Sequence, residues 1–584
     1  MELTRRNFLS GVAVAGMGLA GAGLAGCAPS AENTLAATGA SDVDEAASQG
    51  EAADWLGPEP VIDETDVTAE EDCDVLVIGL GNAGCMAYRA AAEAGAKVIA
   101  VEKSSAYNAT GGAFALIGGA LSERWGRPDI DPEEIINRHM SECGYYVKRS
   151  IISRYVYEVS DVFDWIIEPV EDLYIADDSM ADIPDGCECN LVPDTCPLPK
   201  GYDYREEILP TFPTSVGFGN LGLILGPQIA AAEATGNATA LYGHYAEKLI
   251  KEGSRVVGAY VRNGEDGTYR KINAAKGVVL ATGDYSSNTS MLQAFAPETI
   301  ENGVPAMWIH TDTEGNNTNR GDGHRMGTWA GARMQRHHAP MIHHMGGGAD
   351  ISGQGVMGIN GYLNLNLEGK RFMNEDAPGQ QIENQIEMQP QRTTYQFFDA
   401  KWPEQCGSFP PGHGNVNFCL GADEFPKNNA GAAFCVRTPE SVEEAVAAGT
   451  CFKADTIEEL LAQLEGMDVE TAKTSIERYN ELCHAGSDVD FGKDSRRLFA
   501  LENPPFYACA FTPAIMLVCV GGLESDENCH VYDEERAVIE GLYACGNVQG
   551  DRFAMAYPIA LKGLSVGMAQ FYGYIAGTNA AMGA

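Results

Sequence analysis

Three glycines near the start of the chain follow an apolar run in the pattern GxGxxG, and their spacing suits the binding of phosphate groups. Gly79 permits a tight turn, Gly81 lets the backbone approach a pyrophosphate, and Gly84 lets a helix and a strand pack closely. Asn82 and Ala83 lie between the second and third glycines, where a helix is expected to begin with its free N–H groups facing the phosphates. The pattern predicts a dinucleotide site.

The segments on both sides of these glycines are the ones that such a site requires. Residues 75–78 are apolar and predict a buried parallel strand. An alanine-rich helix is expected next, and the segment KVIAVE predicts a second strand that ends at Glu102. A carboxylate at this position can accept hydrogen bonds from the ribose of an adenosine. Because strand, glycines, helix, strand and acid occur in the right order, the motif is more specific than the glycines alone.

Four further segments occur along the chain: TGGAFALIGG from Thr110, VVLATGDYSSN from Val278, GDGHRMGTWAGA from Gly321 and GLYACGN from Gly541. Together with the first motif they resemble the flavoprotein family of fumarate reductases and succinate dehydrogenases, to which 3-ketosteroid dehydrogenases are also similar. The resemblance covers the chain from about Cys73 to its C-terminus and implies FAD as the cofactor. It implies an α/β fold in which a Rossmann-like FAD-binding domain carries an inserted α+β capping domain for the substrate.

The resemblance also implies roles for individual residues. The residues expected to hold the ADP part of FAD are Gly79, Gly81, Asn82, Ala83, Gly84, Glu102 and Lys103. Those expected to line the pyrophosphate and the flavin, or to close over the dinucleotide, are Thr110, Gly111, Gly112, Thr282 and Gly283. Asp322 is expected near the FAD at the domain junction. At the C-terminal end, the ribityl chain and the flavin are expected to meet Gly546, Asn547, Leu564 and Ser565.

Several cationic positions of the fumarate reductases have no cation in this chain. Those enzymes bind a small dianion, for which arginine forks are well suited. The proton-donating arginine falls at or near Gly379, and a second arginine falls in SGQGVMGIN, which has no basic residue. Val518 replaces a histidine, and Tyr557 stands where a substrate arginine is expected. His337 matches one substrate histidine. A C4-dicarboxylate is therefore poorly supported as the substrate.

The pair Tyr557-Pro558 resembles the segment of 3-ketosteroid dehydrogenases that places a phenol against the carbonyl oxygen of an enone. A neutral phenol can donate a hydrogen bond to an oxygen that gains negative charge as a hydride arrives at the β-carbon. The alternative is a buried core tyrosine whose hydroxyl is satisfied. Tyr362, in an expected two-stranded hairpin over Gly361–Glu375, is a second candidate proton donor, although packing is the more common role of a hairpin tyrosine.

The first residues predict export and anchoring. Arg5 and Arg6 precede a short Gly/Ala-rich apolar stretch, and LAGC ends at Cys27. The paired arginines resemble a twin-arginine signal, and LAGC resembles a lipoprotein box, so Cys27 is the expected lipid anchor. An ordinary cleaved signal with a chance cysteine is the alternative. The expected location is the cell envelope, as an exported, membrane-anchored lipoprotein.

The expected organisation has five parts. These are a signal in 1–27, a disordered acidic tether in 28–71, the first part of the FAD-binding domain in 72–332, the capping domain in 333–517 and the second part of the FAD-binding domain in 518–584. The tether is expected because its Ala/Ser/Asp/Glu-rich composition offers little apolar surface to bury.

Charge and metal-ligand spacing exclude several classes of partner. The formal net charge of the 584 residues is -43, which disfavours a nucleic-acid partner. No metal is expected, because adjacent histidines such as His337 and His338 point to opposite faces of a strand. The chain has no CxxCH haem motif and no iron–sulfur spacing, so the electrons are expected from a separate cytochrome or quinone-linked membrane partner.

The sequence thus predicts an exported FAD-dependent oxidoreductase acting on CH–CH bonds. It would reduce an activated C=C bond, in an enone or an acrylate-like compound, of a small organic molecule. Three alternatives stay open. These are a ketone or ketosteroid-type dehydrogenase that runs the same chemistry in reverse, a fumarate reductase-type dicarboxylate reductase, and a lipoprotein that binds flavin or ligand without turnover.

Overall fold

The structure is a computed structural model that describes residues 54–306, 310–344, 356–377, 379–412, 415–429, 431–432 and 435–583, without the side chains of residues 341–344 and 422. The expected export signal and Cys27 lie outside these residues. Among the residues described, no helix is long and apolar enough to cross a membrane.

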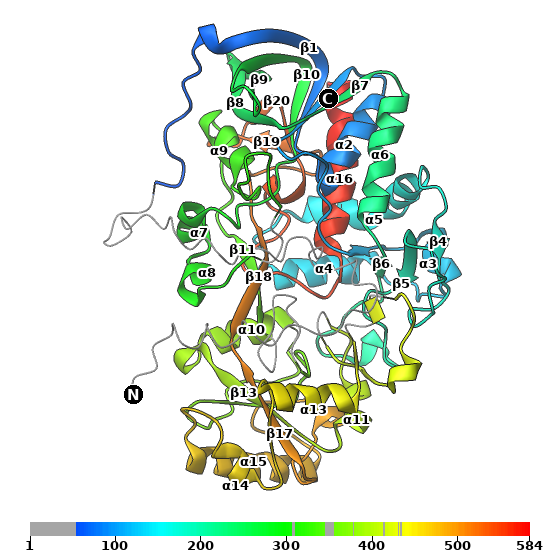
Figure 1. The fold of residues 1–584 in the computed structure, drawn as a ribbon, viewed down its shortest axis with the longest axis vertical. Helices are drawn as coiled ribbons and strands as arrows, with labels where there is room; N and C mark the ends of the chain where they lie inside the picture. The colour runs from blue at the N-terminus through cyan, green and yellow to red at the C-terminus, as the bar shows by residue number, and fades with distance from the viewer. Residues whose placement is uncertain are drawn as a thin grey trace.

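Two sheets of different type dominate the fold (Figure 1). The strands are β1 (Val67–Ile78), β2 (Val98–Glu102), β3 (Ala113–Ala115), β4 (Tyr174–Ile175), β5 (Asn190–Pro193), β6 (Ser215–Phe218), β7 (Ala238–Tyr242), β8 (His244–Glu252), β9 (Arg255–Asn263), β10 (Tyr269–Leu280), β11 (Ala339–His344), β12 (Leu363–Asn366), β13 (Thr394–Asp399), β14 (Phe418–Cys419), β15 (Val436–Arg437), β16 (Phe452–Ala454), β17 (Phe506–Phe511), β18 (Pro513–Val520), β19 (His530–Tyr532) and β20 (Val538–Ala544). The α-helices are α2 (Asn82–Glu93), α3 (Gly119–Arg124), α4 (Pro132–Glu142), α5 (Arg149–Ile167), α6 (Gly222–Ala234), α7 (Thr289–Phe295), α8 (Pro297–Asn302), α9 (Asp322–Trp329), α10 (Gly379–Glu387), α11 (Trp402–Gln405), α13 (Pro439–Ala448), α14 (Ile457–Leu461), α15 (Val469–Ala485) and α16 (Leu564–Met582).

The larger sheet has the strand order β19-β20-β10-β1-β2-β7, and β9 and β8 extend antiparallel from β10. Its four central strands, β20, β10, β1 and β2, run parallel to one another, and β7 continues this direction. Residues 75–78 at the end of β1 are all buried, as is every residue of β2. Continuous burial is typical of parallel strands that are covered on both faces.

Helices α2 and α16 pack together against this sheet, although they come from opposite ends of the chain (Figure 1). Their close approach depends on small residues. A Cβ added to Gly573 would lie 2.2 Å from the carbonyl oxygen of Ala83, and one added to Gly577 would lie 2.3 Å from that of Ala87. The C-terminal helix thereby joins the N-terminal dinucleotide unit in one core, which also contains residues of α5 and α6.

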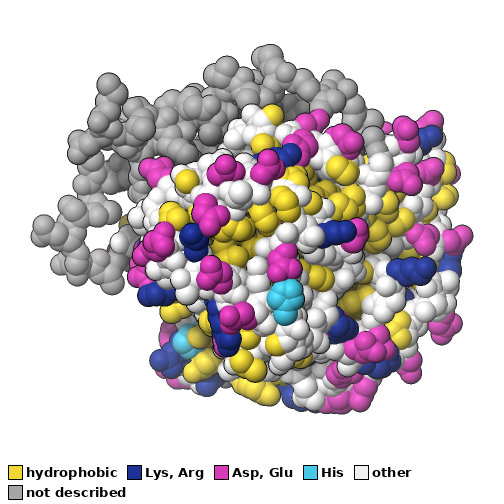
Figure 2. All heavy atoms as spheres, turned by 90° about the horizontal axis from the view of Figure 1, so that it is seen from below, with side chains coloured by type: hydrophobic (Ala, Val, Ile, Leu, Met, Phe, Trp, Pro, Cys, Tyr) yellow, Lys and Arg dark blue, Asp and Glu magenta, His cyan; other side chains and the backbone are white. Residues whose placement is uncertain are grey.

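The second sheet has the order β12-β13-β17-β16 and is antiparallel throughout. All of its strands fall within the range 333–517 that was expected for the capping domain. Helices α14 and α15 cover it and contribute to an apolar core of its own. The antiparallel pair β11–β18 lies between this sheet and the larger one (Figure 1). Seen from below, the molecule shows acidic and basic side chains intermixed on that face, so its acidity is not concentrated there (Figure 2).

Two segments differ from expectation. Residues 54–71 were expected in a tether, but the structure places them against the body. The Trp55 ring meets Phe295 edge-on at 5.0 Å, and β1 already begins at Val67. The expected hairpin over 361–375 forms only its first strand, β12, which pairs with β13. Arg371, where the second strand was expected, instead turns inward and forms buried ion pairs with Glu375 at the end of the segment and with Asp488 far along the chain.

Candidate cofactor cavity and active site

A cavity of about 460 Å³ opens where the parallel strands β1, β2 and β10 end, between the larger sheet and α16. In open α/β sheets this edge is the usual place for a ligand. The predicted cofactor residues that line the cavity are Gly79, Gly81, Asn82, Ala83, Glu102, Lys103, Thr110, Gly111, Thr282, Gly283, Asp322, Gly546, Asn547 and Ser565. Those that do not line it are Gly84, Gly112 and Leu564. The tertiary structure thus gathers residues from across the chain at one edge of the sheet.

The glycine turn has the geometry that its motif predicts. Gly79 adopts φ 96°. A Cβ there would lie 2.5 Å from the carbonyl oxygen of Ala281, the residue that directly follows β10. A Cβ on Gly84 would lie only 1.9 Å from the Gly79 carbonyl oxygen, so Gly84 acts through packing and not through contact with the cavity. Gly81 is the N-cap of α2, and no side chain caps that end. Its open N–H groups are therefore suited to a pyrophosphate.

Four buried polar atoms of residues that line the cavity have no protein partner, which supports a bound polar cofactor. They are Oδ1 of Asn82, Nε2 of His244, Oγ1 of Thr282 and Nε of Arg325. Buried polar groups are nearly always hydrogen-bonded in native proteins, so these atoms are free for the hydroxyl and amide groups of a dinucleotide. Glu102 ends β2 and accepts hydrogen bonds from the backbone N–H groups of Leu80 and Ser104, each at 2.8 Å. Its carboxylate retains lone pairs for a ribose.

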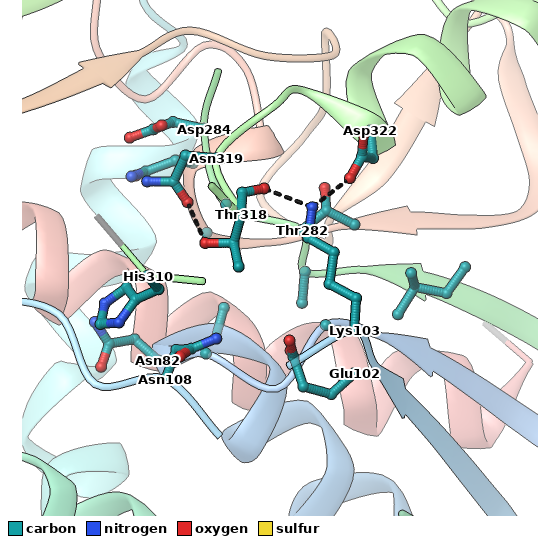
Figure 3. A pocket seen from close by; sticks show the side chains of 18 of the residues that line it. Asn82, Glu102, Lys103, Asn108, Thr282, Asp284, His310, Thr318, Asn319 and Asp322 are labelled. Atoms are coloured by element: carbon teal, nitrogen blue, oxygen red, sulfur yellow. Dashed lines mark hydrogen bonds and ion pairs between the residues drawn. The ribbon is translucent and has the colours of Figure 1, made fainter. Parts of the chain in front are cut away.

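Lys103 and Asp322 form a partly buried link across the cavity (Figure 3). Lys103 Nζ donates to Oδ2 of Asp322 and to the carbonyl oxygen of Thr318, each at 2.6 Å. Burial alone would raise the pKa of Asp322, but Lys103 and Arg325 more than offset that effect and hold its pKa below the usual value. Asp322 is thus a charged first residue of α9, and it ties α9 to the end of β2. Lys103 serves this link in addition to lining the cavity.

Residues that sequence reasoning missed complete the middle of the cavity. His310 Nε2 lies 2.9 Å from Oγ1 of Thr110, and burial lowers the pKa of His310, so its ring is neutral at pH 7. Asp284 directly follows the predicted Thr282-Gly283 pair, and that adjacency is a signal that could have found it. Burial raises the pKa of Asp284 to about 6. His310 belongs to no recognisable motif, so only the fold reveals it.

Tyr557 lines the end of the cavity formed by the C-terminal segment, next to Ser565 of α16. Its ring stacks on Phe553, with centroids 5.4 Å apart and planes 9° from parallel. Burial raises the pKa of Tyr557, while the Ser565 hydroxyl and the Arg552 charge partly oppose the rise. The phenol is therefore neutral at pH 7 and can donate its proton. The N-cap of α16, Gly563, provides no side-chain cap, and the first N–H group of the helix, that of Leu564, donates to the Leu561 carbonyl oxygen at 3.2 Å.

The other two predicted catalytic residues lie outside the cavity lining. Tyr362 packs in an apolar core of the capping sheet with Trp402, and its hydroxyl lies 3.5 Å from the Trp402 carbonyl oxygen. Tyr362 is therefore a core residue of the capping sheet, where its aromatic ring is buried among apolar side chains. The His337 ring lies 4.2 Å from that of Tyr146, and its Nε2 is buried without a partner. Among the described residues, no His/Cys/Asp/Glu cluster is arranged to hold a metal ion.

The segment before β1 crosses the cavity and contributes Pro58 and Pro60 to its lining. Trp329 Nε1 donates to the Gly57 carbonyl oxygen at 3.2 Å. Lys248 Nζ donates to the Pro60 carbonyl oxygen at 3.1 Å and forms an ion pair with Glu59 at 3.3 Å. The segment is thus held against both α9 and β8 at the wall of the cavity.

We expect Lys248→Met to release FAD faster than the parent protein, by about threefold, because a partly exposed ion pair contributes little and one hydrogen bond is lost with it. The release is measured by the rise in flavin fluorescence after dilution. The control is Lys271→Met, which removes an exposed ion pair with Glu70 at 2.8 Å away from the cavity. Equal release rates for the two variants would show that the segment does not retain the cofactor.

Comparisons with known proteins agree with this geometry. The family described as FAD binding domain matches residues 74–564. The chain is 28% identical over 366 residues to the 3-oxosteroid 1-dehydrogenase of Mycolicibacterium smegmatis, a match that covers 57% of each chain, and so spans little more than half of that relative. It is 25% identical over 553 residues to the urocanate reductase of Eggerthella lenta, which covers 92% of this chain and 79% of that one.

A solved structure confirms the fold class. The 3-ketosteroid-Δ4-(5α)-dehydrogenase of Rhodococcus jostii RHA1, in complex with 4-androstene-3,17-dione, superposes with a TM-score of 0.62 at 22% identity. The superposition covers 89% of this chain and 99% of that one. The predicted family, the α/β fold with its Rossmann-like domain and the cofactor are confirmed together. With a family match from residue 74 to residue 564 and a cavity built as a dinucleotide site, this chain belongs to the FAD binding domain family and is an FAD-dependent oxidoreductase.

Proposed function

We propose that this protein reduces the activated C=C bond of a small, uncharged organic molecule, such as an enone or an aryl acrylate ester. The observation that carries the proposal is Tyr557, a neutral phenol at the end of the cavity where a dicarboxylate enzyme would need a cation. Among the described residues, the Lys and Arg side chains that line the cavity are Lys103 and Arg325. Both are paired with Asp322, at 2.6 and 3.0 Å, so Asp322 already balances part of their charge, although Nε of Arg325 has no partner.

The surroundings of Gly379 support the same conclusion. The resemblance places the proton-donating arginine of fumarate reductases at or near this residue. A Cβ on Gly379 would lie 2.7 Å from Cδ1 of Ile359 and 3.2 Å from Cδ1 of Ile559. A side chain at this position would thus meet the terminal methyl groups of two isoleucines. Aliphatic surface favours a neutral substrate, because an unpaired carboxylate against it would lose its hydration without compensation.

The chemistry divides between the cofactor and the chain. FAD, when bound and reduced, supplies a hydride to the β-carbon of the substrate. Tyr557 donates a hydrogen bond to the activating carbonyl oxygen and then its proton, so that the substrate gains two electrons and two hydrogen atoms in total. The O–H bond of Tyr557 breaks in this step, and water restores the proton afterwards. The stacked ring of Phe553 fixes the direction of the phenol.

Export, anchoring through Cys27 and a separate electron donor belong to the proposal as well. They are supported by the paired arginines and the LAGC segment near the start of the chain. A cytochrome or a quinone-linked membrane protein is the class of donor that an anchored flavoprotein would meet. The relatives are named for both directions, reductase and dehydrogenase, so a ketone dehydrogenase that runs the same step in reverse is the second candidate.

The test is anaerobic stopped-flow mixing of the photoreduced holoprotein with fumarate, with α,β-unsaturated ketones and with aryl acrylates. We expect an enone to reoxidise the flavin and fumarate to leave it reduced. Rapid reoxidation by fumarate would instead assign a dicarboxylate reductase. Reduction of the oxidised flavin by saturated ketones alone would assign the reverse reaction, and a flavin that reacts with no acceptor or donor would favour a protein without turnover.

A further inference from the structure

Arg552 is a buried arginine in the segment that carries Tyr557, and the mechanism above does not yet use it. It is 1% exposed, and it is the largest by volume of the fully buried side chains in the described residues. Its Nη2 donates to Oδ1 of Asn547 at 3.0 Å, and its Nε donates to the carbonyl oxygen of Gln549 at 3.4 Å. Its Nη1 is buried with no hydrogen-bond partner. Asn547 lines the cofactor cavity, so the guanidinium lies directly behind the cavity wall.

Arg552 has no directly paired carboxylate among the described residues. None lies within ion-pair distance of its guanidinium, and Asp284, whose pKa of about 6 leaves it largely ionised at pH 7, reaches it only through the amide of Asn547. The titratable groups that face Arg552 from the surrounding elements are His139, Cys529, Cys545, Tyr557 and Tyr572. Burial lowers the pKa of His139 to about 4 and raises the pKa of each of the others, so all are neutral at pH 7.

A buried cation without a directly paired counter-charge is costly, and charged groups in such perturbed surroundings cluster at functional sites. Burial lowers the pKa of Arg552 only to about 10, so the residue remains a cation at pH 7. Its Cζ lies 5.2 Å from the centroid of the Phe553 ring, and the other stacking partner of that ring is Tyr557. The guanidinium and the phenol thus both contact the Phe553 ring, and charges in such buried surroundings are screened less than in water.

We propose that Arg552 is a positioning residue that stabilises the negative charge left on the Tyr557 oxygen when Tyr557 gives its proton to the substrate. This inference rests on the proposed function, in which Tyr557 is the proton donor. In that step the phenolic O–H bond breaks, its electron pair stays on the oxygen, and the proton goes to the substrate. The Tyr557 phenolate then adds a negative charge near the positive charge of Arg552. The two opposite charges stabilise each other while the proton is transferred.

The test is a double-mutant cycle between Arg552→Met and Tyr557→Phe, measured as the rate at which an enone reoxidises the photoreduced holoprotein. We expect Arg552→Met to slow the parent enzyme by about tenfold or more, since an adjacent opposite charge shifts a pKa by one unit or more. In the Tyr557→Phe background the same change should slow the reaction by less than about twofold, because no phenolate forms there. Arg552→Lys, which keeps the charge, should stay within about threefold of the parent.

The pH profile gives a second readout that a merely structural role would not move. A cation stabilises the phenolate, so its removal raises the pKa of Tyr557, and the alkaline decline of the rate should move upward by about one pH unit in Arg552→Met. Arg89→Met is the matched control, because Arg89 is also buried but pairs with Glu93 and Glu168. It should change stability alone and leave the alkaline decline in place.

Three outcomes would overturn the inference: equal slowing in both backgrounds, an unmoved alkaline decline, or an Arg552→Lys variant as slow as Arg552→Met. Should Arg552→Met fail to fold, Arg552→Gln takes its place in the cycle, because it removes the charge and retains an amide that can bond Asn547. A Tyr557→Phe variant as fast as the parent would instead refute the role of Tyr557 in the proposed function, which is a separate failure.

Discussion

Tyr557→Phe is expected to slow reoxidation of the reduced flavin by an enone by a factor of about 10² to 10⁴, the range that one general acid contributes. The phenol is one of the polar groups that the C-terminal segment contributes to the cavity, and phenylalanine fills the same space without the hydroxyl. Because the ring still stacks on Phe553, the cofactor should remain bound. The measurement is single-turnover stopped flow, with the flavin content of each preparation determined from its visible absorbance.

The pH dependence of this variant provides an independent check. Burial raises the pKa of Tyr557 above its ordinary value, so the donor is protonated throughout the neutral range. The rate for the parent should be flat around neutral pH and fall only in the alkaline range, where the proton is lost. The variant should lack that fall. Tyr107→Phe is the control, since Tyr107 donates to the Gly222 carbonyl oxygen at 3.1 Å and lies outside the cavity lining. If Tyr557→Phe reoxidised the flavin as fast as the parent, Tyr557 would have no role in the mechanism.

Gly84→Ala is expected to destabilise the protein by about 3 kcal/mol and to prevent isolation of a yellow holoprotein. The added Cβ would lie 1.9 Å from the carbonyl oxygen of Gly79 and 3.3 Å from Cβ of Ala281. The first contact is with backbone, which has no rotamer to move, so α2 must shift away from the strand that it follows. Urea unfolding of the apoprotein measures the loss of stability without the contribution of the cofactor.

Gly81→Ala is the matched variant that separates folding from binding. A Cβ there meets nothing closer than the Asn108 carbonyl oxygen at 3.7 Å, so the apoprotein should unfold at the same urea concentration as the parent. The methyl group would, however, enter the cavity beside the first turn of α2, where a pyrophosphate must approach the backbone. Affinity for FAD should therefore fall at least tenfold. If both variants bound FAD as the parent does, the cavity would not be the cofactor site.

The sequence predicted the dinucleotide half of this protein well because its determinants are local. The turn at Gly79, the helix that begins after Gly81 and the strand that ends at Glu102 follow from backbone conformation and apolar runs over a few neighbouring residues. The resemblance extended this to Thr282 and to Ser565, which the structure places on the same cavity. Domain boundaries stay a prediction.

Segments whose structure depends on distant partners were predicted less well. The stretch 54–60 has an acidic, loop-like sequence, yet it packs on α9 and β8 through contacts with Trp329 and Lys248. The expected hairpin lacks its second strand, and Arg371 there pairs with two buried carboxylates, one of which, Asp488, lies far along the chain. Tyr362 was a candidate proton donor because of its residue type. Only the packing of the capping sheet shows that it lies among core residues.

By itself, the sequence determined the cofactor, the parallel sheet that binds it and the family, because glycine spacing and continuous apolar runs act within a few residues of chain. Only the tertiary structure decided how charges and side chains are arranged in and around the cavity. It paired Lys103 and Arg325 with Asp322, filled the space beside Gly379 with isoleucines, and buried Arg552 without a directly paired carboxylate behind Tyr557. Charge compensation and exclusion of water depend on distances between segments that no local pattern encodes, and these distances define the chemistry of the site.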